Sequence, residues 1–391
     1  MKVHKNIRLL TWFNFFTDFK LYAPIAIIYF ARVTGSYAIG MSIFSISMIA
    51  EAVFEIPTGV FSDYIGRKNT IVCGAIAAVL FSIFYAIGGS FLALAIAAVF
   101  DGLSQSFYSG NNEAFLHDTL KENEEQHRYG EHFGKTSAMF QFALACSAVI
   151  GGVLATWSFP LIMWLSVIPQ AICLGLSLYM TEPKIKSDGS ANIYSHLKEA
   201  TQNFIKNEKL RLLSISSILG NGFGEASYLF QSAFYNTLWP LWAIGLAKTV
   251  SNLSATASYH FSGKILKKIN AFKIFIVDNV YNRTVNIIAT AFPTAWSPFL
   301  MSTTSALYGV TDTARSDLMQ KEFSSQQRAT MGSLNSLAGS IFFGVLSFAL
   351  GYAADKLAPA HAMLILQIFQ IGNLFIYIKL FNLNKKLQKQ L

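Results

Sequence analysis

The sequence predicts an all-α membrane protein with twelve transmembrane helices in two pseudo-symmetric six-helix bundles. Composition is the first reason, because 53% of the 391 residues are hydrophobic and only 13% are charged, too little charge for the surface of an ordinary soluble protein. The second reason is that the chain divides into apolar stretches of about 20 residues, the length that crosses a hydrocarbon core of about 30 Å. The third is a sequence pattern that recurs in the two halves.

The apolar stretches follow one another with short polar loops between them. The first resembles a signal peptide only superficially, because charged residues interrupt it and no small-residue cleavage site follows, so we expect it to be retained as a span. We place the spans at Arg8–Ala31, Ala38–Ser62, Asn69–Gly88, Phe91–Asp118, Gly134–Thr156, Phe159–Met180, Arg211–Phe234, Leu238–Gly263, Phe272–Phe292, Thr294–Asp317, Gly332–Ala354 and His361–Leu380.

Lysine and arginine residues gather on one side of these spans. That side includes both tails and loops such as the one with Arg67 and Lys68, whereas the opposite side shows only Arg32 and Lys356. The positive-inside rule then places both termini in the cytoplasm, and we expect a multi-pass protein of a bacterial inner membrane. The net charge of +9 therefore reflects topology and not a surface for nucleic acid.

The two halves meet at the longest polar segment of the chain. We expect an N-terminal six-helix bundle over residues 1–182, a cytoplasmic linker over 183–210 and a C-terminal six-helix bundle over 211–391. A repeat supports this division, because the pattern Gly-x2-acid-x4-Asp begins at Gly110 in span four and again at Gly309 in span ten. Two like halves of six spans are typical of transporters with internal repeats.

A hinge with glycines and fixed charges joins spans two and three. Pro57 and Gly59 are expected to permit a bend and close helix contact. We expect Asp63 to end the first helix and Gly66 to make the turn. Two basic residues then stand at the entrance of the next helix, on the cytoplasmic side. The simplest alternative is a short positively charged loop with no mechanical role.

This hinge resembles the signature loop between helices two and three of the major facilitator superfamily (MFS), although Tyr64 stands where that family usually has a basic residue. The resemblance implies a secondary transporter that works by alternating access, with a cavity lined chiefly by spans one, four, seven and ten. It also implies a cytoplasmic gate, closed by a bridge from Arg67 to the acid at the end of span four. The gating residues on this basis are Gly59, Asp63, Gly66, Arg67, Lys68 and Asp118.

Acidic and polar side chains form stripes on span two and on the four spans that the resemblance places around the cavity. A charge at mid-bilayer costs several kcal/mol unless it faces water or a partner, so we expect these acids to be functional. The residues predicted to bind substrate or protons are Asp18, Glu51, Asp101, Gln105, Asn221, Glu225 and Asp312. The alternative for each is an interhelical hydrogen bond with no role in transport. Lys20 lies on the opposite side of its predicted helix from Asp18, so it need not be the partner of Asp18.

Acids outnumber bases in the presumed cavity, which favours proton-coupled export of a cationic or zwitterionic amphiphile. Drug/proton antiporters of the MFS often carry Gly-Pro-x-x-Gly-Gly in span five, and here Ser147 to Gly152 keep only the glycine pair, which weakens the case for antiport and export. Uptake or export of a metabolite or siderophore, and a transport-inactive membrane sensor, are the alternatives.

An enzyme is not expected, because no histidine has a nucleophile at a recognisable spacing and no nucleotide-binding loop occurs. We expect no cofactor and no metal. The partners are then a small-molecule substrate, protons and the lipid bilayer, with no nucleic acid, for a chain that works as a monomer.

Overall fold

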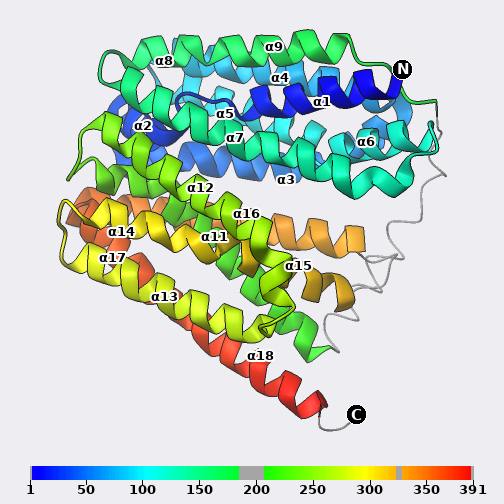
Figure 1. Ribbon diagram of the computed structural model, residues 1–391. Coiled ribbons are helices and arrows are strands. Elements are labelled where there is room, and N and C mark those ends of the chain that lie inside the picture. Colours follow the sequence, from blue (N-terminus) through cyan, green and yellow to red (C-terminus); the bar gives the residue numbers. More distant parts are fainter. Residues whose placement is uncertain (1, 185–206, 323–327, 389–391) are drawn as a thin grey trace. The chain divides into compact units, whose positions relative to one another are not determined.

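The computed structural model describes residues 2–184, 207–322 and 328–388 (Figure 1), and these contain helices and no strand. The chain divides into two compact units: Met1–Gly189 with Pro240–Thr249, and Ser190–Trp239 with Val250–Leu391. Most of the linker expected at 183–210 lies outside the described residues. The domain boundaries drawn from the sequence therefore stay a prediction.

In the first unit the helices follow the first six predicted spans in order. Spans one, four and six each consist of more than one helix, while spans two, three and five are single helices. The elements are α1 (Lys2–Asp18), η1 (Ala23–Ile25), α2 (Ala26–Thr34), α3 (Tyr37–Ile65), α4 (Arg67–Ile87), α5 (Phe91–Tyr108), α6 (Asn111–Lys121), η2 (Gln126–Arg128), α7 (Tyr129–Ala155), α8 (Phe159–Leu165) and α9 (Val167–Leu178).

The second unit repeats this order, with spans ten and twelve divided into shorter helices. Residues Pro240–Thr249, near the start of its second span, group with the first unit. The elements are α11 (Glu208–Tyr235), α12 (Leu241–Leu266), α13 (Ala271–Ala291), α14 (Ser297–Thr303), η3 (Thr304–Leu307), α15 (Tyr308–Glu322), α16 (Arg328–Leu357), α17 (Pro359–Gln370) and α18 (Gly372–Gln388).

Seven helical stretches of the described chain are long and apolar enough to cross a membrane. They correspond to predicted spans two to six, eleven and twelve. Spans one and ten fall outside this group. Spans seven, eight and nine fall outside it because polar and charged residues are distributed along their helices. Three of these five spans, one, seven and ten, carry predicted binding residues, and so do spans two and four within the apolar group.

Each unit has an apolar core made by the corresponding helices. In the first unit, buried side chains of α1, α4, α6 and α9 form one cluster that includes Phe13, Phe115 and Cys173. In the second unit, α11, α13, α15 and α18 form another, which includes Phe275 and Tyr377. Both clusters therefore join the first, third, fourth and sixth spans of their unit, which agrees with two structurally similar halves.

Span one is not the continuous helix that the sequence predicts over Arg8–Ala31. Helix α1 ends at Asp18, a 3-10 turn follows at Ala23–Ile25, and α2 begins at Ala26. Proline is the physical reason, because Pro24 has no N–H to bond to the carbonyl of Lys20 and continue the helix. The expectation that Lys20 lies on the far side of a helix from Asp18 is therefore wrong, since Lys20 lies in the break itself.

Candidate functional site

The break in span one brings a lysine to an acid of span four. Lys20 Nζ lies 3.2 Å from Asp101 Oδ1, and Ser47 Oγ of α3 donates a hydrogen bond of 2.8 Å to Asp101 Oδ2. The Lys20 and Asp101 side chains are only 15% and 16% exposed, and Lys20 Nζ also lies 4.9 Å from the centre of the Phe81 ring. Both carboxylate oxygens of Asp101 are thus engaged, by groups from two other spans.

Two further acids act on the same ammonium group. Asp18, at the end of α1, and Glu51, on α3, both interact electrostatically with Lys20. Gln105 lies half-buried on α5, one turn beyond Asp101. Three carboxyl groups therefore surround one lysine at the place where the helix is interrupted. In the described part of the chain, no group of three or more histidine, cysteine or acidic side chains has the arrangement of a metal site.

Glycines let the neighbouring helices approach this break closely. A Cβ on Gly102 of α5 would lie 2.3 Å from the Ser47 carbonyl oxygen, and one on Gly151 of α7 would lie 1.9 Å from the Leu21 carbonyl oxygen. Gly152 packs in the same way against Gly245 at the start of α12. The glycine pair that remains in span five is therefore explained by packing alone.

In the second unit, the predicted site residues Asn221 and Asp312 both have partners. Arg315 of α15 donates to Asn221 Oδ1 at 3.0 Å and to Tyr377 Oη at 3.2 Å. Tyr259 Oη of α12 donates to Asp312 Oδ2 at 2.9 Å. Arg315 therefore places a cation beside Asn221, a predicted binding residue. The sequence analysis did not single out Arg315 itself.

Glu225 of α11 lies among aromatic hydroxyl groups. It interacts electrostatically with Tyr228, one turn further along α11, and with Tyr308 at the start of α15. Tyr228 in turn donates to Asn252 Oδ1 of α12 at 3.2 Å. Helices α11, α12 and α15 thus share a polar region within the second unit.

Arg283, which the sequence left unexplained on span nine, belongs to a structural network. Its Nη1 donates to the Oε1 atoms of both Gln367 and Gln370 on α17. The amide groups of these glutamines donate onward to Ser227 Oγ at 3.1 Å and to the Phe223 carbonyl oxygen at 3.3 Å, both on α11. The guanidinium therefore connects α13 to α11 through α17.

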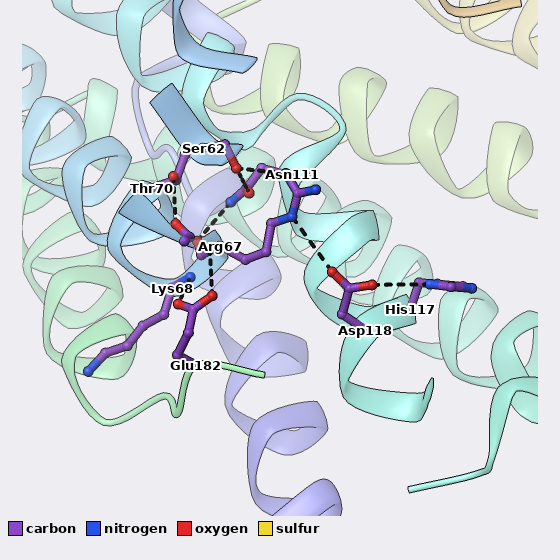
Figure 2. Close-up of polar contacts among 9 residues, drawn as sticks. Ser62, Arg67, Lys68, Thr70, Asn111, His117, Asp118 and Glu182 are labelled. Carbon is purple, nitrogen blue, oxygen red and sulfur yellow. Dashed lines mark hydrogen bonds and ion pairs between the residues drawn. The ribbon is translucent and has the colours of Figure 1, made fainter. Parts of the chain in front are cut away.

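The hinge between α3 and α4 is a second polar centre (Figure 2). Helix α3 continues past Asp63 to its last residue, Ile65, so the expectation that Asp63 ends it is wrong. Gly66 follows as the C-cap, and its φ of 93° favours glycine. Arg67 Nε lies 3.7 Å from Asp118 Oδ2, and Arg67 Nη1 donates to Ser62 Oγ at 2.8 Å. The structure thus brings together the arginine and the aspartate expected to form the bridge, while the side chain of Asp63 lies outside the described part.

Asn111 connects the hinge to the second half of span four. Ser62 Oγ donates to Asn111 Oδ1 at 2.7 Å, and Asn111 Nδ2 donates to the Arg67 carbonyl oxygen at 3.0 Å. Asn111 is the first residue of α6 and follows Gly110, whose φ of 66° separates α5 from α6. The glycine of the repeated pattern therefore orients an amide toward the hinge.

Glu182, which the sequence analysis did not single out as a site residue, caps the start of α4. Its Oε1 and Oε2 atoms accept hydrogen bonds of 2.7 Å from the backbone N–H groups of Arg67 and Lys68. A Cβ on Gly66 would lie 2.7 Å from this carboxylate. The signal was present in the sequence, because Gly66 has no side chain to cap α4 and an acid follows span six on the same side of the membrane.

The role expected for Gly59 needs correction. Among the described residues, no heavy atom outside its own stretch of helix lies within 4 Å of the position that its Cβ would take, so no close helix contact is seen there. Thr58 makes that contact instead, through a hydrogen bond of 3.0 Å from its Oγ1 to the Ser106 carbonyl oxygen of α5.

The family model described as Major Facilitator Superfamily matches residues 9–347. The chain belongs to the Major Facilitator Superfamily. It is similar to an uncharacterised MFS-type transporter of Methanocaldococcus jannaschii, with 25% identity over 95% of this chain and 96% of that protein. It is also similar to the uncharacterised MFS-type transporter YxaM of Bacillus subtilis, with 21% identity over 81% of this chain and 82% of that protein.

Solved structures of MFS proteins share the fold. The nucleoside transporter NupG has a TM-score of 0.80 at 13% identity and covers 97% of this chain and 99% of its own. A bacterial homologue of the human lysosomal transporter Spinster has a TM-score of 0.72 at 14% identity and covers 97% of this chain and 95% of its own. At such low identity the likeness shows a common fold and carries no information about the substrate.

Membership in the MFS settles the general function. This MFS protein is a multi-pass membrane transporter that moves a small molecule across a lipid bilayer by alternating access, and it is not an enzyme. The predicted fold class, twelve transmembrane helices in two six-helix bundles, is confirmed.

Proposed function

We propose that this MFS transporter exports a cationic or zwitterionic amphiphile from the cytoplasm across a bacterial inner membrane in exchange for protons, as a monomer with both termini in the cytoplasm. The observation that carries the proposal is the ion pair of Lys20 with Asp101 at the break in span one, where Asp18 also interacts electrostatically with Lys20. Charged groups at such depth are costly unless they take part in binding or in a proton pathway.

The exchange follows from competition for negative charge. In the state described, Lys20 neutralises Asp101. A substrate ammonium group that contacts Asp101 leaves Lys20 to pair with Asp18, while a carboxylate on a zwitterionic substrate pairs with Lys20 itself. A proton that binds to Asp101 removes the counter-charge of the substrate cation, and the cation then leaves. Substrate and proton therefore exclude each other at one group.

The second unit has polar and aromatic groups of its own that suit an organic cation. Glu225, near Tyr228 and Tyr308, combines a negative charge with aromatic rings, which suits an organic cation. Asp312, held by Tyr259, is a further acid on α15. We propose Glu225 as the second acid that responds to protons and Asn221 as a polar contact to substrate.

The hinge gates the cytoplasmic side in this proposal. The contact between Arg67 and Asp118, supported by Ser62 and Asn111, holds α6 against the loop that begins α4. Breaking this contact opens that side. Asp63 is proposed to act with Arg67 and Asp118, as in the motif that the hinge resembles.

The experiment uses purified protein in proteoliposomes with an imposed pH gradient, with ethidium as the fluorescent cation and a pH-sensitive dye for proton flux. We expect Asp18→Asn, Asp101→Asn and Glu225→Gln each to lower gradient-driven ethidium transport by more than tenfold. Glu113→Gln is the matched control, because Glu113 is an exposed acid on α6 and its loss should leave transport unchanged. Wild-type rates in all three variants under a proton gradient would mean that these acids are structural.

Transport of an anionic metabolite is the second candidate, and Lys20 is the observation that favours it, because a buried ammonium group binds a carboxylate or phosphate. A panel of radiolabelled carboxylates in the same vesicles separates the two. If a carboxylate moves, ethidium does not, and Lys20→Gln stops the movement, then the metabolite is the substrate. If neither class of compound moves, the transport-inactive alternative is favoured.

A further inference from the structure

A pocket of about 460 Å³ lies at one end of the second unit, at the turn between α12 and α13. It is formed by the end of α12, the turn that leads into α13, and parts of α15 and α18, whose positions within this unit can be followed in Figure 1. Its polar lining includes Lys267, Lys268, Asn270 and Asn384, with Asp317 at one side. All of these residues belong to one unit and to the described chain.

The pocket has an excess of positive charge. Its two lysines and one aspartate give a net charge of +1, and both lysines are exposed. Neither lysine has an ion-pair partner among the described residues. Exposed lysines also flank the pocket one turn before it on α12, two residues into α13 and directly after Asn384. A negatively charged ligand would therefore meet unneutralised ammonium groups.

The floor of the same pocket is apolar. Leu266, Ile269, Phe272, Ala314 and Leu318 contribute to it, and Phe272 and Ala314 belong to the apolar core of the unit. Asn270 Oδ1 already accepts a hydrogen bond of 2.9 Å from the Phe272 N–H at the start of α13. A free inorganic anion gains nothing from such a floor, whereas an amphiphile with an anionic head group matches both the floor and the rim.

The position of the pocket along the spans also points to a lipid. The turn from Lys267 to Asn270 joins spans eight and nine, and the distribution of basic residues places it on the cytoplasmic side. The inner leaflet supplies anionic lipids there, and basic pockets between helices on that side bind their head groups. We propose that this pocket binds the phosphate-containing head group of an anionic phospholipid, with Lys267 and Lys268 on the phosphate and the glycerol and first acyl carbons on the apolar floor.

The test measures lipid binding directly and does not depend on the transported substrate. Purified protein in a non-ionic detergent is titrated with phosphatidylglycerol, with phosphatidylcholine and with inorganic phosphate, and bound lipid is counted by native mass spectrometry while the thermal midpoint is followed. We expect phosphatidylglycerol to bind, and Lys267→Gln with Lys268→Gln to weaken its binding about 30-fold, since each lysine contributes about one kcal/mol.

A second double variant serves as the control, because it removes the same amount of positive charge from outside the pocket. Lys121→Gln with Lys356→Gln also removes two exposed lysines, and neither of these lines or flanks the pocket. It should bind phosphatidylglycerol as the wild type does. Equal binding of phosphatidylcholine, equal weakening in both double variants, or lysine-dependent binding of inorganic phosphate alone would each overturn the proposal. Size-exclusion profiles identify any variant that has lost its fold, and Lys267→Arg with Lys268→Arg, which should retain binding, then decides.

Discussion

The two units join their first and last spans at equivalent places but by different chemistry. In the first unit, buried Asn6 of α1 forms two hydrogen bonds, of 2.9 and 3.0 Å, with the backbone of Thr181 after α9. In the second unit, Lys379 of α18 lies 2.8 Å from Glu208 at the start of α11, with side chains 61% and 44% exposed. A buried amide pair is insensitive to salt, whereas an exposed ion pair is screened by it. At this end, the first unit is therefore held by directional hydrogen bonds to a buried side chain, and the second by a weak, exposed ion pair.

The loops between the second and third spans of each unit differ in the same direction. The loop at Gly66 is held by residues from distant parts of the sequence, because Glu182 caps α4 and Asn111 binds the Arg67 carbonyl group. The loop at Asn270 is capped only by its own asparagine and lies over an open, basic pocket. The first loop is thus held by the protein, and the lipid proposal above would have the second held by the membrane. The predictions below test this difference.

The largest effect is expected at the two glycines of the hinge. Gly66→Ala places a Cβ against the Glu182 carboxylate at a φ of 93°, and should lower the free energy of unfolding by about 3 kcal/mol. Gly59→Ala is the matched control, because its Cβ meets nothing within 4 Å inside a helix, and it should stabilise the protein by about 0.5 kcal/mol. Denaturant titration in detergent measures both. Equal effects at the two positions would show that Glu182 does not constrain the loop.

The next effect compares the caps of the two loops. Glu182→Ala leaves two N–H groups at the start of α4 without their charged acceptor and should cost about 2 kcal/mol. Asn270→Ala removes an ordinary helix cap and should cost about 1 kcal/mol. The same titration compares them directly. A larger loss for Asn270→Ala would reverse the assignment of the tighter loop.

A functional prediction concerns the contact between Arg67 and Asp118. The two side chains are 21% and 17% exposed, so the pair contributes about 1 kcal/mol and its loss should lower turnover about fivefold, with little change in ligand affinity. Lys68→Ala removes the same charge from the same loop, and in Figure 2 the Lys68 side chain extends away from Asp118. Turnover in proteoliposomes should therefore fall in Arg67→Ala and not in Lys68→Ala. Normal turnover in both variants would leave the loop as a marker of topology only.

Apolar length and loop charge were sufficient to predict the helices and the fold class, because both are local properties of the chain. The helix break at Lys20 was not predicted, because a long run of apolar residues indicates one span and does not show that Pro24 interrupts the helix. The contacts of the site were harder to predict, since Lys20 and Asp101 lie 81 positions apart and Glu182 lies 115 positions from Arg67. No spacing rule in one sequence connects such positions. The acids themselves were identifiable, because a charge within an apolar span requires a partner.

The smallest effect concerns the ion pair that joins the ends of the second unit. Lys379 donates to Glu208 and its positive charge lies beside the carboxylate, which holds the pKa of Glu208 below its ordinary value of 4.5. Since the folded state lowers this pKa, the pair adds stability above pH 4.5 and loses it as the pH falls through the lower pKa of the folded state. Lys379→Met should therefore reduce the thermal midpoint slightly at pH 7 in dilute buffer and by less at pH 3. Because both groups are exposed, the difference at pH 7 should also disappear in 0.5 M salt, a concentration of roughly this order being enough to screen surface pairs.

Asn6→Ala, by contrast, should lower the midpoint equally at both pH values and both salt concentrations, since neither an amide nor a backbone group titrates. A salt-dependent loss in Asn6→Ala, or a salt-independent one in Lys379→Met, would contradict the difference between the two units.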